Sequence, residues 1–75
     1  MIYKNYYADG ISERIQKRLM ELGRPISWLA NEMDISYPSA RNYVHGYSNM
    51  NLPTFIHICE VLEVTPNWMI YGEEK

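Results

Sequence analysis

The segment from residue 26 to residue 46, ISWLANEMDISYPSARNYVHG, constrains the fold of this chain more than any other. Leu29 and Ala30 precede a turn at residues 34–36, and helical spacing of apolar residues resumes after that turn. The segment therefore predicts two short helices joined by a tight turn. A small side chain at Ala30 allows the two helices to cross closely. Such a pair presents its second helix outward, in a shape that fits the major groove of DNA.

Composition is that of one small domain. The 75 residues lie near the lower limit for a self-sufficient core, and the hydrophobic fraction of 47% is too high for a disordered chain. No apolar run approaches the roughly 18 residues that span a bilayer. The first residues, MIYKNYYADG, lack the apolar region of a signal peptide, so we expect a cytoplasmic protein. A single cysteine, Cys59, excludes an internal disulfide.

Charge is distributed unevenly along the chain. Residues 1–46 carry six Lys or Arg against five Asp or Glu, a net +1, whereas residues 47–75 carry one against four, a net −3. The total of −2 argues mildly against nucleic acid as a partner, but the half with the helix pair is slightly basic. We therefore expect only modest non-specific affinity for phosphate backbones.

Periodicity and capping residues predict five helices and no strand. We expect an N-terminal arm at residues 1–9, a helical domain at residues 10–72 and an acidic tail at residues 73–75. The first helix is predicted to start near Asp9 or Ser12 and to stop at Gly23. The other predicted signals are N-caps at Ser36, Asn51 and Thr65, a left-handed turn residue at Asp34, and helix-ending glycines at Gly46 and Gly72.

The order of these elements resembles the phage repressor and Cro-type (XRE) family of helix-turn-helix DNA-binding domains. The resemblance runs from about Ile11 to Gly72, and the closing run LEVTPNWMIYGEE is its most specific part. It implies an all-α, compact five-helix lambda-repressor-like fold in which the second and third helices form the helix-turn-helix. The matching positions are Arg14-Ile15, Leu29-Ala30, Ile35-Ser36, Gly46, Leu62-Glu63-Val64, Trp68-Met69 and Gly72.

The chain departs from the pattern of that family at three places. Ile26 stands where the family often has a phosphate-contacting glutamine, and Asp34 stands where the turn usually has glycine. Leu19 and Val44 replace a buried arginine and glutamate that the family commonly pairs. Both partners are apolar here, which is often neutral or stabilising, so this difference supports the alignment.

The resemblance also implies a reading surface on the third helix. Tyr37, Pro38 and Asn42 match positions that meet base edges in the family. Asn42 can pair with adenine through two hydrogen bonds, and Arg41 can reach guanine or a phosphate. The full set of expected DNA-binding residues is Ser36, Tyr37, Pro38, Ser39, Arg41, Asn42, Tyr47, Ser48, Asn49 and Arg14.

Several of these residues also have a purely structural interpretation. Ser36 is a helix cap whatever else it does, and Pro38 suits the first turn of a helix. The segment 47–49 is either a phosphate contact or only a turn. Arg14, with the nearby Lys17 and Arg18, either flanks the DNA groove or belongs to a solvated helix face.

No residue pattern points to catalysis, a metal or a cofactor, so we do not expect an enzyme or a small-molecule substrate. The expected function is transcription regulation as a sequence-specific repressor of phage or mobile-element type, acting in the bacterial cytoplasm and associated with the nucleoid when bound. One third helix reads few base pairs, so a homodimer on a pseudo-palindromic operator of double-stranded DNA is expected. The alternative is a protein-interaction module, such as an antitoxin, an anti-repressor or an accessory factor.

Overall fold

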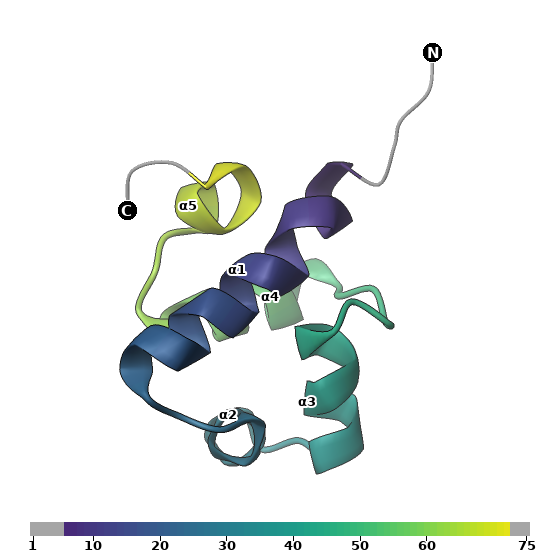
Figure 1. Cartoon of the computed structure of the whole chain (residues 1–75). Coiled ribbons are helices and arrows are strands. Elements are labelled where there is room, and N and C mark those ends of the chain that lie inside the picture. Colours follow the sequence, from purple (N-terminus) through teal and green to yellow (C-terminus); the bar gives the residue numbers. More distant parts are fainter. Residues whose placement is uncertain (1–5, 73–75) are drawn as a thin grey trace.

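The computed structural model describes residues 6–72, with side chains from Gly10 onward. In this range all of the regular secondary structure is helical, without a strand, as the sequence predicts. No described helix has the length and apolar character needed to cross a membrane. The helices are α1 (Tyr6–Leu22), α2 (Ile26–Met33), α3 (Tyr37–Val44), α4 (Leu52–Leu62) and α5 (Pro66–Tyr71) (Figure 1).

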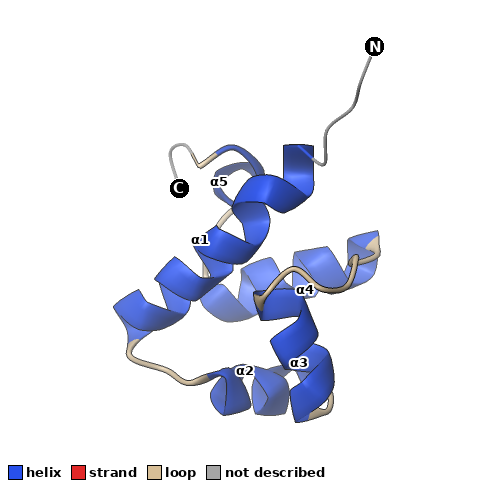
Figure 2. Cartoon of the chain, turned by 45° about the vertical axis from the view of Figure 1, so that its right-hand side comes forward, coloured by secondary structure: helices blue, strands red, loops and turns tan. Residues whose placement is uncertain are grey.

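Helix α1 is the element around which the others are arranged, since it contacts α3, α4 and α5. Helices α2 and α3 pack against each other at one end of the molecule, while α5 packs on α1 at the opposite end (Figures 1 and 2). Helix α4 contacts α1, α2 and α5 and so joins the two ends. The core is a single cluster of buried apolar residues from all five helices, among them Ile15, Leu29, Val44, Ile58, Leu62 and Met69.

The predicted N-caps are confirmed for three helices. Ser36, Asn51 and Thr65 each accept a hydrogen bond from the backbone N–H three residues later, at 3.2, 2.9 and 3.0 Å. Each bond satisfies one of the N–H groups that a helix leaves unpaired at its start. These caps fix where α3, α4 and α5 begin.

The predicted start of the first helix is wrong. Helix α1 begins at Tyr6, not near Asp9 or Ser12, so four residues assigned to the arm are helical. A lone glycine such as Gly10 costs only about 1 kcal/mol in a helix, and no proline interrupts this stretch. Polar residues that resemble caps therefore lie inside the helix. The rest of the predicted arm (1–5) and the tail (73–75) lie outside the described residues.

Three side chains of α1 bind the carboxyl ends of three other helices. Arg14 Nη1 donates to the carbonyl oxygen of Met69 at 2.8 Å, at the end of α5. Gln16 Nε2 donates to Val44 O at 3.0 Å, and Arg18 Nε donates to Leu62 O at 2.8 Å. Last-turn carbonyls lack partners within their own helix and carry partial negative charge, so these donors are well placed. Helix α1 thereby holds the ends of α3, α4 and α5.

Two non-glycine residues adopt the left-handed backbone conformation at helix ends. Asp34, with φ 58°, follows α2 as predicted, and Glu63, with φ 59°, follows α4, which the sequence analysis did not anticipate. A side chain at positive φ is strained by roughly 1–2 kcal/mol. The Glu63 carboxylate also lies at the negative end of the helix dipole.

Replacing Glu63 with glycine is therefore expected to stabilise the protein, by about 0.5–1 kcal/mol after the greater flexibility of unfolded glycine is subtracted. Urea denaturation measures this change. The matched control is Glu60→Gly, an exposed position inside α4, which is expected to destabilise by about 1 kcal/mol. An equal decrease in the free energy of unfolding for the two variants would contradict backbone strain at Glu63.

Candidate nucleic-acid interface

Helix α3 has one buried side and one exposed side. Ala40 and Val44 are 0% and 1% exposed and hold α3 against the core. Tyr37 and Arg41 are exposed, and because they lie four residues apart they share one face of the helix. Pro38 is exposed as well, and Asn42 is partly buried at the edge of this face. Three residues that the resemblance matches to base-contacting positions, Tyr37, Pro38 and Asn42, thus lie on or at the edge of one outward face. Arg41, expected to reach guanine or a phosphate, lies on the same face.

Arg41 provides the positive charge of that face. Its side chain is exposed, and no carboxylate among the described residues forms an ion pair with it. Helix α3, YPSARNYV, contains no acidic residue. The guanidinium can therefore donate to a ligand without first breaking an internal contact.

The first turn of α3 offers fewer N–H groups than expected. The Ser39 N–H is bound to Ser36 Oγ, and Pro38 has no N–H. This leaves the Tyr37 N–H as the unbound donor of this turn within the described residues. The Ser36 hydroxyl donates to Ser39 Oγ at 3.0 Å, so the proton of the Ser39 hydroxyl can point to another acceptor. One backbone and one side-chain donor can bind an anion here.

The segment after α3 exposes a second group of polar side chains. The Tyr47 ring is 69% exposed and stacks on His45, with ring centroids 5.8 Å apart and an interplanar angle of 29°. Ser48 and Asn49 are exposed next to it. The three residues predicted as a second phosphate contact therefore lie on the surface that continues from the carboxyl end of α3.

Arg14 does not join this surface. Its guanidinium binds Met69 at the end of α5 and packs against Gly10 and Gly72. Arg18 is engaged in the same way at the end of α4 and also forms an ion pair with Glu21, with 3.2 Å between Nη1 and Oε1. Three cations of α1, Arg14, Lys17 and Arg18, are candidates to flank the DNA groove. Among them, within the described part of the chain, Lys17 alone is exposed without a partner.

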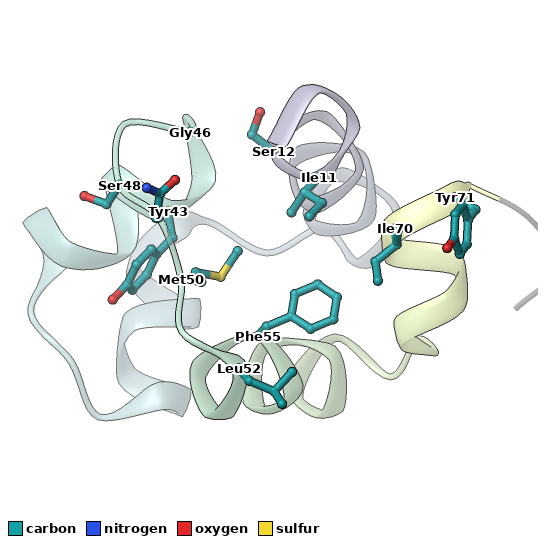
Figure 3. A pocket seen from close by; sticks show the side chains of 11 residues that line it. Ile11, Ser12, Tyr43, Gly46, Ser48, Met50, Leu52, Phe55, Ile70 and Tyr71 are labelled. Atoms are coloured by element: carbon teal, nitrogen blue, oxygen red, sulfur yellow. The ribbon is translucent and has the colours of Figure 1, made fainter. Parts of the chain in front are cut away.

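Sequence reasoning missed two features near this surface. Gln16 fixes the carboxyl end of α3 through Val44 O, but an exposed glutamine on a helix gives no signal of such a bond. An open apolar groove of about 480 Å³ lies beside the 46–50 segment (Figure 3). Its lining comes from α1, α3, the loop after α3, α4 and α5, so no local pattern could have predicted it.

Other reactive groups give no rival site in the described residues. No group of three His, Cys, Asp or Glu residues gathers there in a metal-binding arrangement. Burial, with a smaller contribution from Glu60, raises the pKa of Cys59 to about 11. The thiol therefore stays protonated near neutral pH and is a poor nucleophile.

The described part of the chain is thus a small all-α domain. One exposed face of α3 carries Arg41, whose positive charge is not paired with a carboxylate among the described residues. Comparison with protein-family models, with curated proteins and with solved structures finds no match to it.

Proposed function

We propose that this protein is a sequence-specific DNA-binding transcriptional regulator, a repressor of phage or mobile-element type. In this proposal α2, the turn at residues 34–36 and α3 form a helix-turn-helix, and α3 enters the major groove. The observation that carries the proposal is the outward face of α3. It holds Tyr37, Arg41 and Asn42 together, while Ala40 and Val44 fix the helix from behind.

In this proposal Arg41 and Asn42 contact the bases. The amide of Asn42 donates to and accepts from adenine, and the fork of Arg41 fits the O6 and N7 acceptors of guanine. The ring of Tyr37 and the apolar surface of Pro38 suit contact with a thymine methyl group. Each good bidentate pair contributes about 1–3 kcal/mol of discrimination between bases.

Phosphate contacts orient the helix on the duplex without reading sequence. The Tyr37 N–H and the Ser39 hydroxyl supply them at the start of α3, and the exposed segment 47–49 supplies them beyond its end. Because Arg41 is the only cation on α3, we expect few released counterions and a shallow dependence of affinity on salt. Specific binding then requires two copies of α3 on a pseudo-palindromic operator.

A titration with duplex DNA tests the proposal. Wild-type protein is expected to bind at low salt and to weaken as salt rises. The double variant Arg41→Ala plus Asn42→Ala is expected to lose roughly 100-fold in affinity for a selected operator. This corresponds to about 3 kcal/mol, because the variant removes the base contacts of Asn42 and the positive charge of Arg41. Fluorescence anisotropy with labelled duplexes measures both effects.

The matched control is Arg24→Ala plus Asn31→Ala, which removes the same two residue types from exposed positions outside α3. Its operator affinity should stay within about threefold of wild type, since neither residue lies on the proposed face. Failure of the wild-type protein to bind DNA at low salt would contradict α3 as the base-contacting helix. Equal losses of operator affinity in the two double variants would contradict it too.

A protein-interaction module is the second candidate. The net charge of −2 and the exposed rings of Tyr37 and Tyr47 favour it, because aromatic residues are enriched at protein interfaces and Lys or Arg clusters at nucleic-acid interfaces. Salt-sensitive DNA affinity separates the two functions: a module that binds only protein shows none.

A further inference from the structure

Helix α4 carries a stripe of exposed side chains, which we call the α4 stripe. Leu52, Ile56 and Glu60 lie on successive turns, four residues apart, and Glu63 follows at the carboxyl end of the helix. Leu52 is 70% exposed, Ile56 is 36% exposed, and both glutamates are exposed. At roughly 1.5 Å per residue the stripe spans about 16 Å. Its first half is therefore apolar and its second half acidic.

The apolar half of the α4 stripe borders the open groove. Leu52 and Phe55 of α4 line that groove together with Ile11 of α1 and Ile70 of α5, as Figure 3 shows, and its volume is about 480 Å³. A concave apolar surface beside exposed leucine and isoleucine side chains marks an interaction site. A helix is about 10–12 Å wide with its side chains, so the groove fits one or two anchoring side chains of a partner and not a whole helix.

The acidic half of the α4 stripe has no positive partner among the described residues. Neither Glu60 nor Glu63 forms an ion pair there. Arg18 reaches the same end of α4, where its Nε donates to Leu62 O, but its guanidinium is already paired with Glu21. Two uncompensated carboxylates in line with exposed apolar residues are complementary to a partner that carries positive charge at the matching distance.

The two halves of the α4 stripe together favour one kind of occupant. A purely apolar occupant would bury the two carboxylates without partners, which is costly. A two-fold pairing of two α4 stripes would set the glutamates against the glutamates or against the apolar residues of the other copy, and both arrangements are unfavourable. An amphipathic helix satisfies both halves when it carries apolar side chains on one turn and Lys or Arg two to three turns further along.

We infer that the α4 stripe and the groove form a docking site for a basic amphipathic helix of a partner protein. Apolar side chains of that helix enter the groove beside Leu52, and its Lys or Arg side chains lie along Glu60 and Glu63. The α4 stripe shares no residue with the outward face of α3 or with the segment 47–49, so the inference goes beyond the proposed function and does not depend on DNA binding. The contact is small, and a dissociation constant of roughly 10–100 µM is expected.

Two series of synthetic peptides test this site on the full chain without DNA. Each peptide is a helix former of roughly 18 residues with a pair of leucines one turn apart. The first series carries a pair of lysines at spacings of about two to three turns from the leucines, and the second carries glutamates in the same places. Isothermal titration calorimetry at low salt is expected to give the best lysine peptide a dissociation constant of roughly 10–100 µM, and its glutamate counterpart a value at least about tenfold higher.

Charge variants test the acidic half of the site. Glu60→Gln plus Glu63→Gln is expected to reduce the preference for the lysine peptide to less than about threefold, because no carboxylate then faces the lysines. The matched control is Glu13→Gln plus Glu32→Gln, which removes the same charge from exposed positions outside the site and should keep the full preference. All four positions are exposed, so circular dichroism should show an intact fold in both double variants.

Truncation of Leu52 tests the apolar half. Leu52→Ala is expected to weaken binding of the lysine peptide at least about fivefold, because the groove loses part of its wall. Met20→Ala is the matched control, since Met20 is 80% exposed and lies outside the groove, and it should bind like wild type. Amide shifts of labelled protein on addition of the peptide should be confined to α4 and the groove lining.

Three results would overturn the inference. The first is equal affinity of wild-type protein for the two peptide series, or no binding of either at roughly 1 mM. The second is an equal loss of preference in the two double glutamine variants. The third is a shift of α4 amides when the protein concentration alone is raised, which would identify a second copy as the occupant. None of these measurements contains DNA, so failure of the docking site is distinguishable from failure of DNA binding.

Discussion

Leu19→Arg is expected to lower the free energy of unfolding by about 3–5 kcal/mol, because it places an unpaired charge in the core. Leu19 is 5% exposed and belongs to the same buried cluster as Val44, which is 1% exposed. A domain of this length has a total stability of only about 4–11 kcal/mol. At the lower end of that range much of the single variant should be unfolded at 25 °C, and Val44→Glu should behave similarly.

The double variant Leu19→Arg plus Val44→Glu should be more stable than the two separate losses predict. Gln16, one turn before Leu19, donates to the Val44 carbonyl oxygen, so positions 19 and 44 belong to the same contact between α1 and α3. Arginine and glutamate in these places can pair, and the expected coupling is about 2 kcal/mol or more. Urea denaturation of the wild type, the two single variants and the double variant measures this coupling as a double-mutant cycle.

Met20→Arg is the control, since Met20 is 80% exposed next to Leu19 on the same helix. Its stability should change by less than about 0.5 kcal/mol. Additive losses in the double variant would mean that the two positions do not face each other. The interpretation of Leu19 and Val44 as an apolar replacement for the arginine–glutamate pair of the family would then lose its support.

Local signals explain which parts of the fold could be predicted from sequence. Caps such as Ser36, Asn51 and Thr65 act through hydrogen bonds within four residues, and glycine and proline act on their own backbone, so these helix ends were predictable. The outward face of α3 also follows from helical spacing alone. The start of α1 was not predictable in this way, because the cap-like Asp9 and Ser12 are compatible with the interior of a helix.

Long-range contacts explain what sequence reasoning could not supply. Helical spacing predicts that Arg14 and Arg18 are surface cations. Their guanidinium groups instead bind carbonyl oxygens 55 and 44 residues away. Whether such a residue meets solvent, DNA or a helix end depends on where other helices end in space. The groove has the same origin, since Ile11 and Ile70 meet there only after folding. Whether the α3 face binds DNA remains a prediction.

Ile58→Ala is expected to destabilise the protein by about 3–4 kcal/mol, which is roughly 15–25 °C in melting temperature. Ile58 is 0% exposed on α4, the helix that contacts α1, α2 and α5. Truncation removes buried apolar atoms and leaves a cavity that three surrounding helices cannot close without shifting. Scanning calorimetry and urea denaturation measure the loss.

Ile56→Ala provides the matched comparison, with the same substitution on the same helix two residues earlier. Ile56 is 36% exposed, so its truncation should lower the free energy of unfolding by less than about 1 kcal/mol. A similar cost at the two positions would contradict the orientation of α4. Helix α4 carries both Phe55, whose ring points into the groove, and Ile58, which is buried in the core, so its rotation about its own axis fixes the core and the groove together.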